Sequence, residues 1–574
     1  MKKNTFKRLL SEMGKDRFPM AVSFILAALS AVSSLMIPVI VGNAIDAMTD
    51  GIVWSVIKES LFKIAILTGI TAVTRFAVET VNNRIACRVV KNLRHASYMK
   101  LSKLPVSYFD SRPKGDLLSR IISDTDAVSD GLLMGMSQFF YGIVTIVTTL
   151  IFMFSINVKI TFAVILLTPL SLVVAYAIAK STYKLFLSQS EKKAKETAFL
   201  SENLGNIKLL KAFVREEKSM EAFTAVADDY TASAKKAIFA SSLTNPATRF
   251  VGAVIYAAIG LFGALTVIGS GGLTVGGLTC FLSYAGQYSK PFNEISGVIS
   301  ELQNSLACAS RVFELIDEKE ICDTVTEELP ECKGDFEFKN VSFSYDKNRT
   351  LLENVSFKAK AGDKIAIVGP TGCGKTTLIN LLMRFYDPDG GEILLDGCDI
   401  TKVSRAELRH RFGMVLQDTF LFEDTVRENI RIGRPDATEE EVIAAAKNSH
   451  AHSFIKKLPK GYDTVLSEGG CELSEGERQL LSITRVMLSS PPVLILDEAT
   501  SSIDTGTEMK INDAFSKMMV GKTSFIVAHR LSTVRNADMI LVMKDGNIIE
   551  QGTHDELLSK HGFYEKLFRS QFDG

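Results

Sequence analysis

The arrangement of hydrophobic and polar residues divides the chain near residue 310. Four stretches before that point contain no charged residue: 18–45, 131–158, 160–179 and 250–289. A helix needs about 20 apolar residues to cross a bilayer, so each stretch is long enough to span one. Lys2 and Lys3 give the first stretch the look of a signal peptide, but it is too long for the hydrophobic region of one. We therefore expect a helical membrane domain in the first half of the chain.

Interruptions of the apolar pattern set the number of membrane spans. Lys159 alone separates the second stretch from the third, which predicts a tight helical hairpin. The fourth stretch is too long for one crossing, and the glycine-rich segment Gly269–Gly277 divides it into two helices. A further apolar segment, Ile64–Val81, contains Arg75 and Glu79. We predict six spans in a transmembrane domain of residues 1–315.

Two long polar connections lie between these spans, at about 84–130 and 181–243. Apolar residues recur in them at helical spacing, as at Leu200, Leu204, Ile207 and Leu210. Neither connection carries the strand pattern that an independent soluble insert would need. We expect the membrane helices to continue well into the cytosol.

Basic residues indicate the orientation of the membrane domain. Lysine and arginine are frequent before residue 18 and between residues 84 and 120, whereas residues 48–57 contain none. Segments rich in these residues stay on the cytosolic side of a membrane. We expect a multi-pass protein of the cytoplasmic membrane with both termini in the cytosol.

Two pairs of opposite charges lie within or near predicted spans, the second near the cytosolic half of the last one. Arg75 and Glu79 are four residues apart, as are Lys290 and Glu294, so each pair shares one helix face. Charges at membrane depth often line a substrate path, although they also form structural ion pairs between helices. The sequence leaves both interpretations open.

The composition changes to that of an α/β domain after an acidic linker at 316–335. In the domain of residues 336–574, Gly369-Pro-Thr-Gly-Cys-Gly374-Lys375-Thr376 matches the G-x-x-x-x-G-K-[ST] phosphate-binding loop. Lys364–Val368 before it predicts a buried strand, and residues 377–383 after it predict a helix. Lys375 would then reach the β- and γ-phosphates, and Thr376 would ligate Mg²⁺. The residues expected to hold the phosphates are Gly369, Thr371, Gly372, Cys373, Gly374, Lys375, Thr376 and Thr377.

A second apolar run, Val493–Asp497, ends in two carboxylates, Asp497 and Glu498. A carboxylate at the end of a strand beside a phosphate loop is placed to hold Mg²⁺, directly or through water. We expect this role for Asp497. Glu498 would then be the general base that activates the attacking water.

Charge and cysteine content add little to this picture. Lysine plus arginine equal aspartate plus glutamate at 65 each, so net charge gives no reason to expect a nucleic-acid partner. The eight cysteines show no spacing of a metal site or of a secreted disulfide framework. We interpret them as reduced thiols.

With these motifs in order, the chain resembles the ATP-binding cassette exporters over essentially its whole length. The resemblance implies that Tyr345 stacks on adenine, that Gln417 couples Mg²⁺ and water to the membrane domain, and that His529 contacts the γ-phosphate. It also implies that Tyr108–Asp116 and Glu202–Phe213 are the two intracellular coupling segments.

The same resemblance implies a dimer. Leu473-Ser-Glu-Gly-Glu477 occupies the place of the family signature Leu-Ser-Gly-Gly-Gln, whose Ser474 and Gly476 N–H would close the ATP site of a second chain. Glu475 and Glu477 depart from that signature, and a carboxylate near a triphosphate is unfavourable unless it points away or pairs with a base such as Arg478. An intact Glu498 beside an altered signature is similar to one subunit of heterodimeric bacterial exporters. We favour a heterodimer over a homodimer.

The expected function is ATP-driven export of an amphipathic small molecule, lipid or peptide by alternating access. A cassette-gated channel and an ATP-driven importer remain alternatives, while the predicted spans exclude a soluble DNA-associated ATPase. The sequence does not name the substrate, because no motif encodes which residues of the helices face inward.

Overall fold

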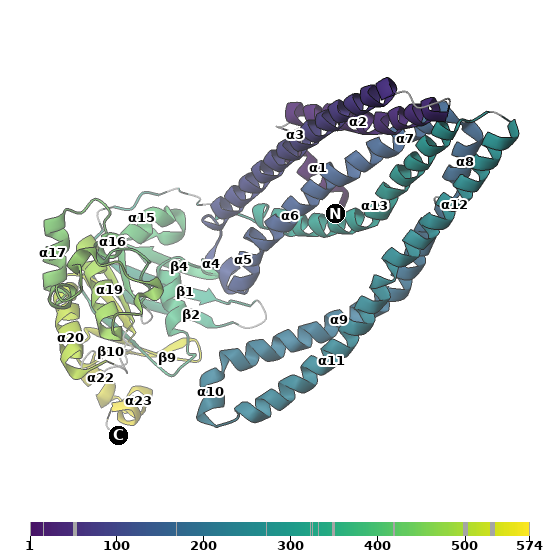
Figure 1. Cartoon of the computed structure of the whole chain (residues 1–574). Coiled ribbons are helices and arrows are strands. Elements are labelled where there is room, and N and C mark those ends of the chain that lie inside the picture. Colours follow the sequence, from purple (N-terminus) through teal and green to yellow (C-terminus); the bar gives the residue numbers. More distant parts are fainter. Residues whose placement is uncertain are drawn as a thin grey trace. The chain divides into compact units, whose positions relative to one another are not determined.

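The computed structural model describes residues 2–14, 17–49, 54–167, 169–270, 272–321, 323, 325, 327–330, 332–346, 350–416, 419–497, 503–527 and 534–572. The chain forms two compact units (Figure 1). One unit comprises Met1–Ser102 and Pro113–Glu318, and the other comprises Lys103–Arg112 and Lys319–Gly574.

The first unit is helical throughout its regular elements. Its helices are α1 (Lys2–Met13), α2 (Arg17–Thr49), α3 (Trp54–Leu101), α5 (Lys114–Ile121), α6 (Ser123–Met134), the π-helix η2 (Gly135–Phe140), α7 (Tyr141–Ile156), α8 (Val158–Leu167), α9 (Pro169–Gly205), α10 (Ile207–Ala212), α11 (Glu216–Ser242), α12 (Thr244–Ser270) and α13 (Val275–Ile316). The predicted hairpin at Lys159 is present, with α8 starting two residues after α7 ends.

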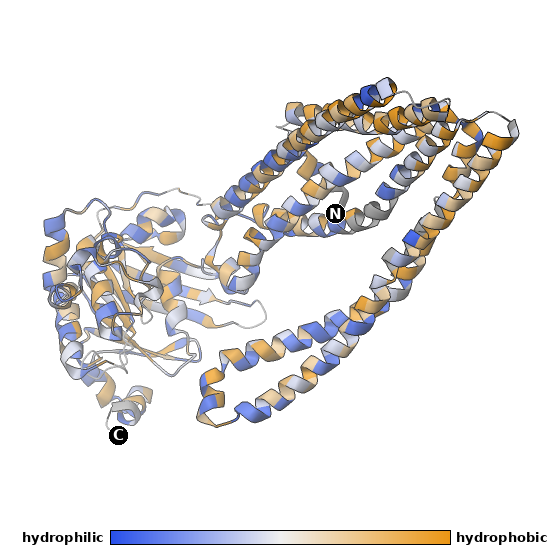
Figure 2. Cartoon of the chain, in the orientation of Figure 1, coloured by the Kyte–Doolittle hydropathy of each residue, from blue (hydrophilic) through white to orange (hydrophobic). Residues whose placement is uncertain are grey.

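Four of the described helices are long and apolar enough to cross a membrane: Phe18–Thr49, Trp54–Leu101, Lys114–Ile156 and Arg249–Gly269. They match the first, second, third and fifth predicted spans, including the segment that contains Arg75. The fourth and sixth predicted spans fall on α8–α9 and α13, whose side chains the structure describes only in part. Apolar residues dominate α7 and α12, whereas α9 and α11 become polar toward α10 (Figure 2).

The long polar connections are helical, as the periodicity predicts. α9 and α11 run side by side as a hairpin that α10 closes (Figure 1). Lys192 Nζ lies 2.6 Å from Asp229 Oδ1, and the rings of Phe199 and Phe223 stack between the two helices. Elsewhere in this unit, Arg311 of α13 binds the buried carboxylate of Asp124 in α6 through its Nε, at 2.7 Å from Oδ2. Paired charges and stacked rings thus join these polar helices.

Close backbone packing joins one end of α2 to the start of α13. A Cβ atom on Gly276 would lie 1.9 Å from the carbonyl oxygen of Gly42, so only glycine fits there. Beside this crossing, the Asp46 carboxylate accepts hydrogen bonds from Gly276 N and Thr274 Oγ1, each at 2.7 Å. The carboxylate thereby satisfies free N–H and hydroxyl donors at the N-terminus of α13.

A buried polar contact joins three other elements of the first unit. Asn82 of α3 accepts a hydrogen bond from Ser23 Oγ of α2 at 2.6 Å and donates one to Ser137 Oγ of η2 at 3.1 Å. Asn82 is almost fully buried, so both bonds offset the cost of removing its amide from water. The π-helical turn that carries Ser137 is thus tied to two neighbouring helices.

The second unit is an α/β domain, and the short helix α4 belongs to the same unit. Its elements are α4 (Val106–Asp110), β1 (Phe336–Phe343), β2 (Leu352–Ala359), β3 (Lys364–Val368), α14 (Lys375–Leu382), β4 (Gly390–Leu395), β5 (Cys398–Asp399), η3 (Ile400–Lys402), α15 (Arg405–His410), β6 (Phe412–Val415), α16 (Val426–Arg431), α17 (Glu439–Asn448), α18 (His452–Ile455), η4 (Gly461–Asp463), η5 (Glu468–Gly470), α19 (Glu475–Ser489), β7 (Val493–Asp497), α20 (Thr505–Met519), β8 (Thr523–Val527), β9 (Met539–Lys544), β10 (Asn547–Gly552), α22 (His554–Ser559) and α23 (Phe563–Phe572). The strand predicted before the phosphate loop and the one predicted at Val493–Asp497 are both confirmed, with the predicted bounds.

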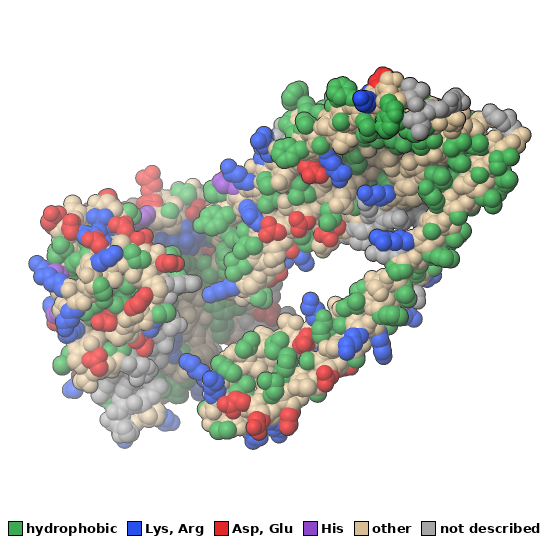
Figure 3. Space-filling view, viewed as in Figure 1, with side chains coloured by type: hydrophobic (Ala, Val, Ile, Leu, Met, Phe, Trp, Pro, Cys, Tyr) green, Lys and Arg blue, Asp and Glu red, His purple; other side chains and the backbone are tan. Residues whose placement is uncertain are grey.

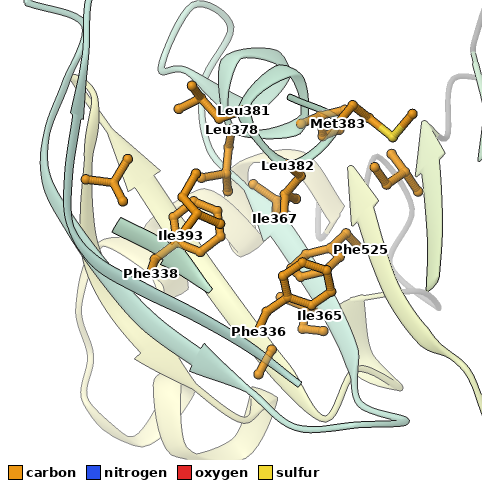
Figure 4. Packing of buried hydrophobic residues seen from close by; sticks show 14 of the residues in the cluster. Phe336, Phe338, Ile365, Ile367, Leu378, Leu381, Leu382, Met383, Ile393 and Phe525 are labelled. Atoms are coloured by element: carbon orange, nitrogen blue, oxygen red, sulfur yellow. The ribbon is translucent and has the colours of Figure 1, made fainter. Parts of the chain in front are cut away.

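Two sheets build this domain. The larger has the order β10-β9-β3-β8-β7-β6, in which β9, β3, β8, β7 and β6 are parallel, and the smaller antiparallel sheet has the order β2-β1-β4-β5. Phe336 and Phe338 of the smaller sheet pack with Ile365 and Ile367 of β3 and with Phe525 of β8 (Figure 4). α14 adds Leu378, Leu381 and Leu382 to the same cluster. The apolar core thus fixes the strand and the helix that flank the phosphate loop.

Described residues of the predicted linker at 316–335 bind the α/β domain, and Asp323 is one of them. Asp323 accepts a hydrogen bond from Arg405 N at 2.9 Å and pairs with the Arg405 guanidinium. Although burial acts to raise it, the pKa of the Asp323 carboxyl lies below its usual value because Arg405 bonds to the charged form. This contact fixes part of the predicted linker.

Candidate ATP site

The phosphate loop connects β3 directly to α14. Gly369, Gly372 and Gly374 have φ angles of 156°, 84° and 104°, in a region that residues with a side chain rarely adopt. A Cβ atom would lie 2.3 Å from Met543 O at Gly369 and 2.8 Å from Leu352 Cδ2 at Gly374. The loop therefore needs glycine at these positions, and its N–H groups precede the positive end of α14.

The reactive side chains of the loop differ in exposure. Lys375 Nζ donates hydrogen bonds to Gly369 O at 2.7 Å and to Pro370 O at 3.1 Å, so the ammonium group lies over the loop. Thr371 and Thr376 are exposed, whereas Thr377 is buried. Cys373 is also buried, and burial raises the pKa of its thiol although Lys375 acts in the opposite direction. The loop thus presents a cation and a hydroxyl to a bound phosphate.

The other predicted site residues follow strands that end at the same edge of the larger sheet. Asp497 is the last residue of β7, which pairs in parallel with β6 and β8. Gln417 comes two residues after β6 and His529 two residues after β8, while Glu498 follows Asp497 directly. Gln417, Glu498 and His529 lie outside the described residues. The carboxyl ends of neighbouring parallel strands share one edge of a sheet. β6, β7 and β8 therefore end at the same edge as β3, which the phosphate loop follows.

The residues at this edge fit a magnesium ion. Mg²⁺ prefers oxygen ligands and is usually held by one or two protein groups together with phosphates and water. Thr376 offers an exposed hydroxyl in the first turn of α14, and Asp497 offers a half-exposed carboxylate at the end of β7. When bound, the ion would neutralise charge on the phosphates.

Tyr345 lies two residues beyond β1 and contacts the phosphate-loop helix. Its side chain is 51% exposed, which leaves room for a base to stack on it. Asn380 Nδ2 of α14 donates a hydrogen bond to the Tyr345 hydroxyl at 3.0 Å. The ring of Tyr386 packs edge-on at 5.0 Å between centroids. These two contacts hold the Tyr345 ring at its edge.

Ser474 begins α19 as its N-cap. Its Oγ accepts a hydrogen bond from Glu477 N at 3.3 Å, while Glu477 Oε2 accepts from both Ser474 N and Ser474 Oγ at 2.9 Å. This is a capping box, an arrangement that glutamine at the same position would also form. Glu477 thus turns back onto Ser474, and Glu475 is exposed. Gly476 is buried, and a Cβ there would lie 2.5 Å from Thr507 Cγ2.

Comparison with known proteins agrees with this geometry. Residues 20–292 match the ABC transporter transmembrane region, and residues 352–501 match the ABC transporter family. An uncharacterized ABC transporter ATP-binding protein of Bacillus subtilis, YfiC, is 37% identical over 573 residues, which cover 100% of this chain and 95% of that protein. The chain belongs to the ABC transporter family. It is a half-transporter that fuses a helical transmembrane region to an ATPase domain, the cassette, which binds ATP and hydrolyses it to drive transport.

Other relatives place it among the exporters. A fatty acid ABC transporter ATP-binding/permease protein of Mycobacterium tuberculosis is 42% identical over 82% of this chain and 74% of its own length. An ATP-dependent lipid A-core flippase of Syntrophus aciditrophicus is 37% identical over 85% of this chain and 81% of its own length. The structure of a bacterial Atm1-family ABC exporter with ATP bound matches with a TM-score of 0.79 and 30% identity, over 97% of this chain and 98% of the other. The fold is that of an ABC exporter, a class that works as a dimer in the membrane.

The two predicted coupling segments differ in their surroundings. Residues 108–112 of the first, which include the end of α4, belong to the same compact unit as the cassette, and Tyr108 is buried. The second forms the tip of the α9–α11 hairpin. There Leu204, Leu209 and Phe213 are exposed, and charged side chains lie between the apolar ones (Figure 3).

Sequence reasoning missed Arg485 of α19. Its guanidinium donates to Asn429 O at 2.6 Å, to Phe420 O at 2.7 Å and to Asn429 Oδ1 at 2.8 Å. Burial lowers the pKa of Arg485 to about 10. It thereby fixes the segment that follows Gln417 to the signature helix. A basic residue four positions after the buried Leu481 is a signal for such a contact, but it does not indicate the partner.

Proposed function

We propose that this transporter exports an amphipathic small molecule, lipid or peptide across the cytoplasmic membrane by alternating access. The observation that carries the proposal is the phosphate loop between β3 and α14, in a chain whose other unit contains apolar helices of membrane length. ATP favours closure of two cassettes, because it binds the closed state better than the open one. Hydrolysis then releases them. Basic residues before the first span and after the second support cytosolic termini and a cytosolic cassette.

Each site residue has a proposed role in this cycle. Tyr345 stacks on adenine, and the loop from Gly369 to Thr377 holds the phosphates with Lys375. Thr376, Asp497 and Gln417 hold Mg²⁺. Glu498 accepts a proton from the attacking water, and His529 contacts the γ-phosphate. Gln417 also connects the site to the membrane region. These assignments follow from the shared sheet edge and from the family motif at each position.

A second chain is proposed to complete the transporter. The exposed apolar tip of the α9–α11 hairpin carries the exposed cations Lys208 and Lys211. The cassette has a pocket of about 610 Å³ whose lining includes the apolar Phe422 and Ile432, the three carboxylates of Glu423, Asp424 and Glu428, and one cation, Arg431. Apolar surface and opposite charge support docking of one chain's tip into the other chain's pocket.

We favour a heterodimer because of the contact between Glu477 and Ser474. The Ser474 hydroxyl donates to the Glu477 carboxylate at 2.9 Å, whereas closing the partner's ATP site requires that hydroxyl to donate to a phosphate. The carboxylate competes for the hydroxyl and also repels the phosphate. A partner with an unaltered signature would complete the site of this chain, whose Glu498 is intact, while this chain's signature would form a weaker site.

The substrate is proposed to be lipid-like. The names of the fatty acid transporter and the lipid A-core flippase support this class. Arg75 and Glu79 form an ion pair at 3.4 Å within α3, so among the described contacts the pair does not join two helices. The Arg75 guanidinium also lies 5.6 Å from the centre of the Tyr141 ring. Both charges are more than half exposed in the single chain, which favours a role in the substrate path. Lys290 is exposed as well, and the side chain of Glu294 lies outside the described residues.

The first test is the Mg²⁺-dependent ATPase rate of the purified chain in lipid, beside a Glu498→Gln variant. Turnover that the substitution abolishes would indicate that the chain completes its own sites as a homodimer. Folded protein that binds ATP without turnover would support the missing partner. Loss of ATP binding itself in the wild-type chain would refute the proposal. Transport of a fluorescent phosphatidylethanolamine in proteoliposomes, compared with ATP-dependent conductance, separates an exporter from a gated channel.

A further inference from the structure

An aromatic cluster lies beside the proposed base-binding residue. Tyr345 contacts Phe343 and Tyr386 edge-on, with ring centroids 4.9 and 5.0 Å apart, and Phe343 contacts Tyr386 at 5.5 Å. Asn380 binds the Tyr345 hydroxyl. Because the edge and the hydroxyl of Tyr345 are held, a base that covers its exposed face acts on Tyr386 through the contact between the two rings.

Tyr386 connects this cluster to the first coupling segment. Its hydroxyl donates a hydrogen bond to Asp110 Oδ2 at 2.5 Å, and Asp110 is the last residue of α4. Burial, and then the Asp110 carboxylate, raise the pKa of Tyr386 well above its usual value. The hydroxyl therefore stays protonated and remains a donor at any physiological pH.

The backbone on both sides of this contact is anchored. Asp389 Oδ2 accepts from Ser344 N at 2.8 Å, and Asp389 N donates to Ser342 O at 2.9 Å, which holds the loop after Tyr386 against the end of β1. Five residues before the coupling segment, Ile321 N donates to Lys103 O at 3.1 Å. Because the backbone is held on both sides, a movement of the Tyr386 side chain is transmitted to Asp110 and is not absorbed by a loose loop.

We propose that Tyr386 is a positioning residue that transmits occupancy of the base site to the coupling segment. The inference rests on the proposed stacking of adenine on Tyr345. The route runs from the base through the rings of Tyr345 and Tyr386 to the hydroxyl and Asp110. It starts at the base, whereas the proposed route through Gln417 starts at the phosphates. A purine covers more of Tyr345 than a pyrimidine does, so the coupling segment distinguishes ATP from UTP even when both fill the phosphate loop.

Hydrogen–deuterium exchange of the full-length transporter in nanodiscs tests this route. The measured quantity is the change that nucleotide causes in two segments, the phosphate loop at 369–377 and the first coupling segment at 108–116. Mg²⁺-ATP is expected to slow exchange in both segments, and Mg²⁺-UTP mainly in the phosphate loop. Tyr386→Phe is expected to retain the ATP effect on the phosphate loop and to lose most of the effect on the coupling segment. A merely structural role for the hydroxyl would speed exchange of the coupling segment equally with and without ATP.

Matched variants test whether the hydrogen bond between Tyr386 and Asp110 carries the effect. Asp110→Asn keeps an acceptor for the Tyr386 hydroxyl and is expected to retain the ATP effect, whereas Asp110→Ala is expected to lose it. Tyr462→Phe removes another hydroxyl of the same cassette, which bonds to His452 Nδ1 at 2.8 Å, and is expected to change neither segment. Full protection of the coupling segment in Tyr386→Phe, or equal protection by UTP and ATP, would overturn the proposal. Absence of any ATP effect in the wild-type phosphate loop would overturn the proposed ATP site as well.

Discussion

Replacing Glu477 by glutamine is expected to tighten ATP binding between the two cassettes. Glu477 Oε2 accepts hydrogen bonds from Ser474 N and Ser474 Oγ, each at 2.9 Å. Glutamine has nearly the same shape, so its amide oxygen preserves the bond to Ser474 N and the helix cap. It carries no charge, so it holds the Ser474 hydroxyl less strongly, and the hydroxyl turns more readily to a phosphate oxygen.

Two effects set the size of the change. A hydrogen bond to a charged group contributes about 1.5–3 kcal/mol, and solvent at this half-exposed position reduces the contribution to about 1 kcal/mol. Repulsion between the carboxylate and a phosphate charge about 4 Å away contributes about 1 kcal/mol in water. A gain of about 1–2 kcal/mol corresponds to about 5- to 30-fold in affinity.

The assay is a titration with a fluorescent ATP analogue of dimers in nanodiscs that carry Glu498→Gln to prevent hydrolysis. The half-saturating concentration is expected to fall on adding Glu477→Gln. Glu472→Gln is the matched control, because Glu472 accepts from Ser467 N at 3.0 Å in the same loop and does not bind Ser474. A change of less than about twofold in Glu477→Gln, with two cassettes per particle and unchanged thermal stability, would refute the reasoning.

Three further predictions concern packing and reactivity. Gly276→Ala would place a methyl group 1.9 Å from Gly42 O and is expected to destabilise the membrane region by about 1–3 kcal/mol, whereas Gly286→Ala on the same helix meets no atom within 4 Å; thermal unfolding in detergent compares them. Phe525→Ala removes a fully buried ring from the cassette core and should cost about 3–5 kcal/mol, seen as a lower unfolding temperature of the cassette. Burial raises the pKa of Cys373, so iodoacetamide is expected to modify it slowly at pH 7 and faster above pH 9, as mass spectrometry would show; pH-independent modification would contradict this.

Local motifs made the centre of the site predictable from sequence. The apolar run before Gly369 and the glycines after it specify strand, loop and helix within one short segment, and the structure forms them with that strand's predicted bounds. The same holds for the strand that ends at Asp497. Helical spacing likewise predicted that the polar connections continue the membrane helices.

Contacts between residues far apart in the chain could not be predicted from the sequence. The sequence indicates that Glu477 departs from the signature, but it offered Arg478 as a partner, and only the helix start at Ser474 shows where the carboxylate turns. Tyr386 and Asp110 are 276 residues apart, so no pattern in either segment indicates that they meet. The crossing of Gly42 and Gly276 depends on which helices pack together, and hydrophobicity alone does not specify this in a membrane.

The π-helical turn η2 has a consequence for insertions and deletions in this part of the chain. Its hydrogen bonds span one residue more than those of an α-helix, so Gly135–Phe140 contain a residue that an uninterrupted helix would not need. Deleting one residue there can restore a regular helix and leave the faces of α7 nearly in place, because the wider turn already absorbs the extra residue. Deleting one residue from the regular turns of α7 would instead rotate everything beyond by about 100° relative to α6. A one-residue deletion is therefore expected to disturb the packing of α7 less within Gly135–Phe140 than within α7 itself.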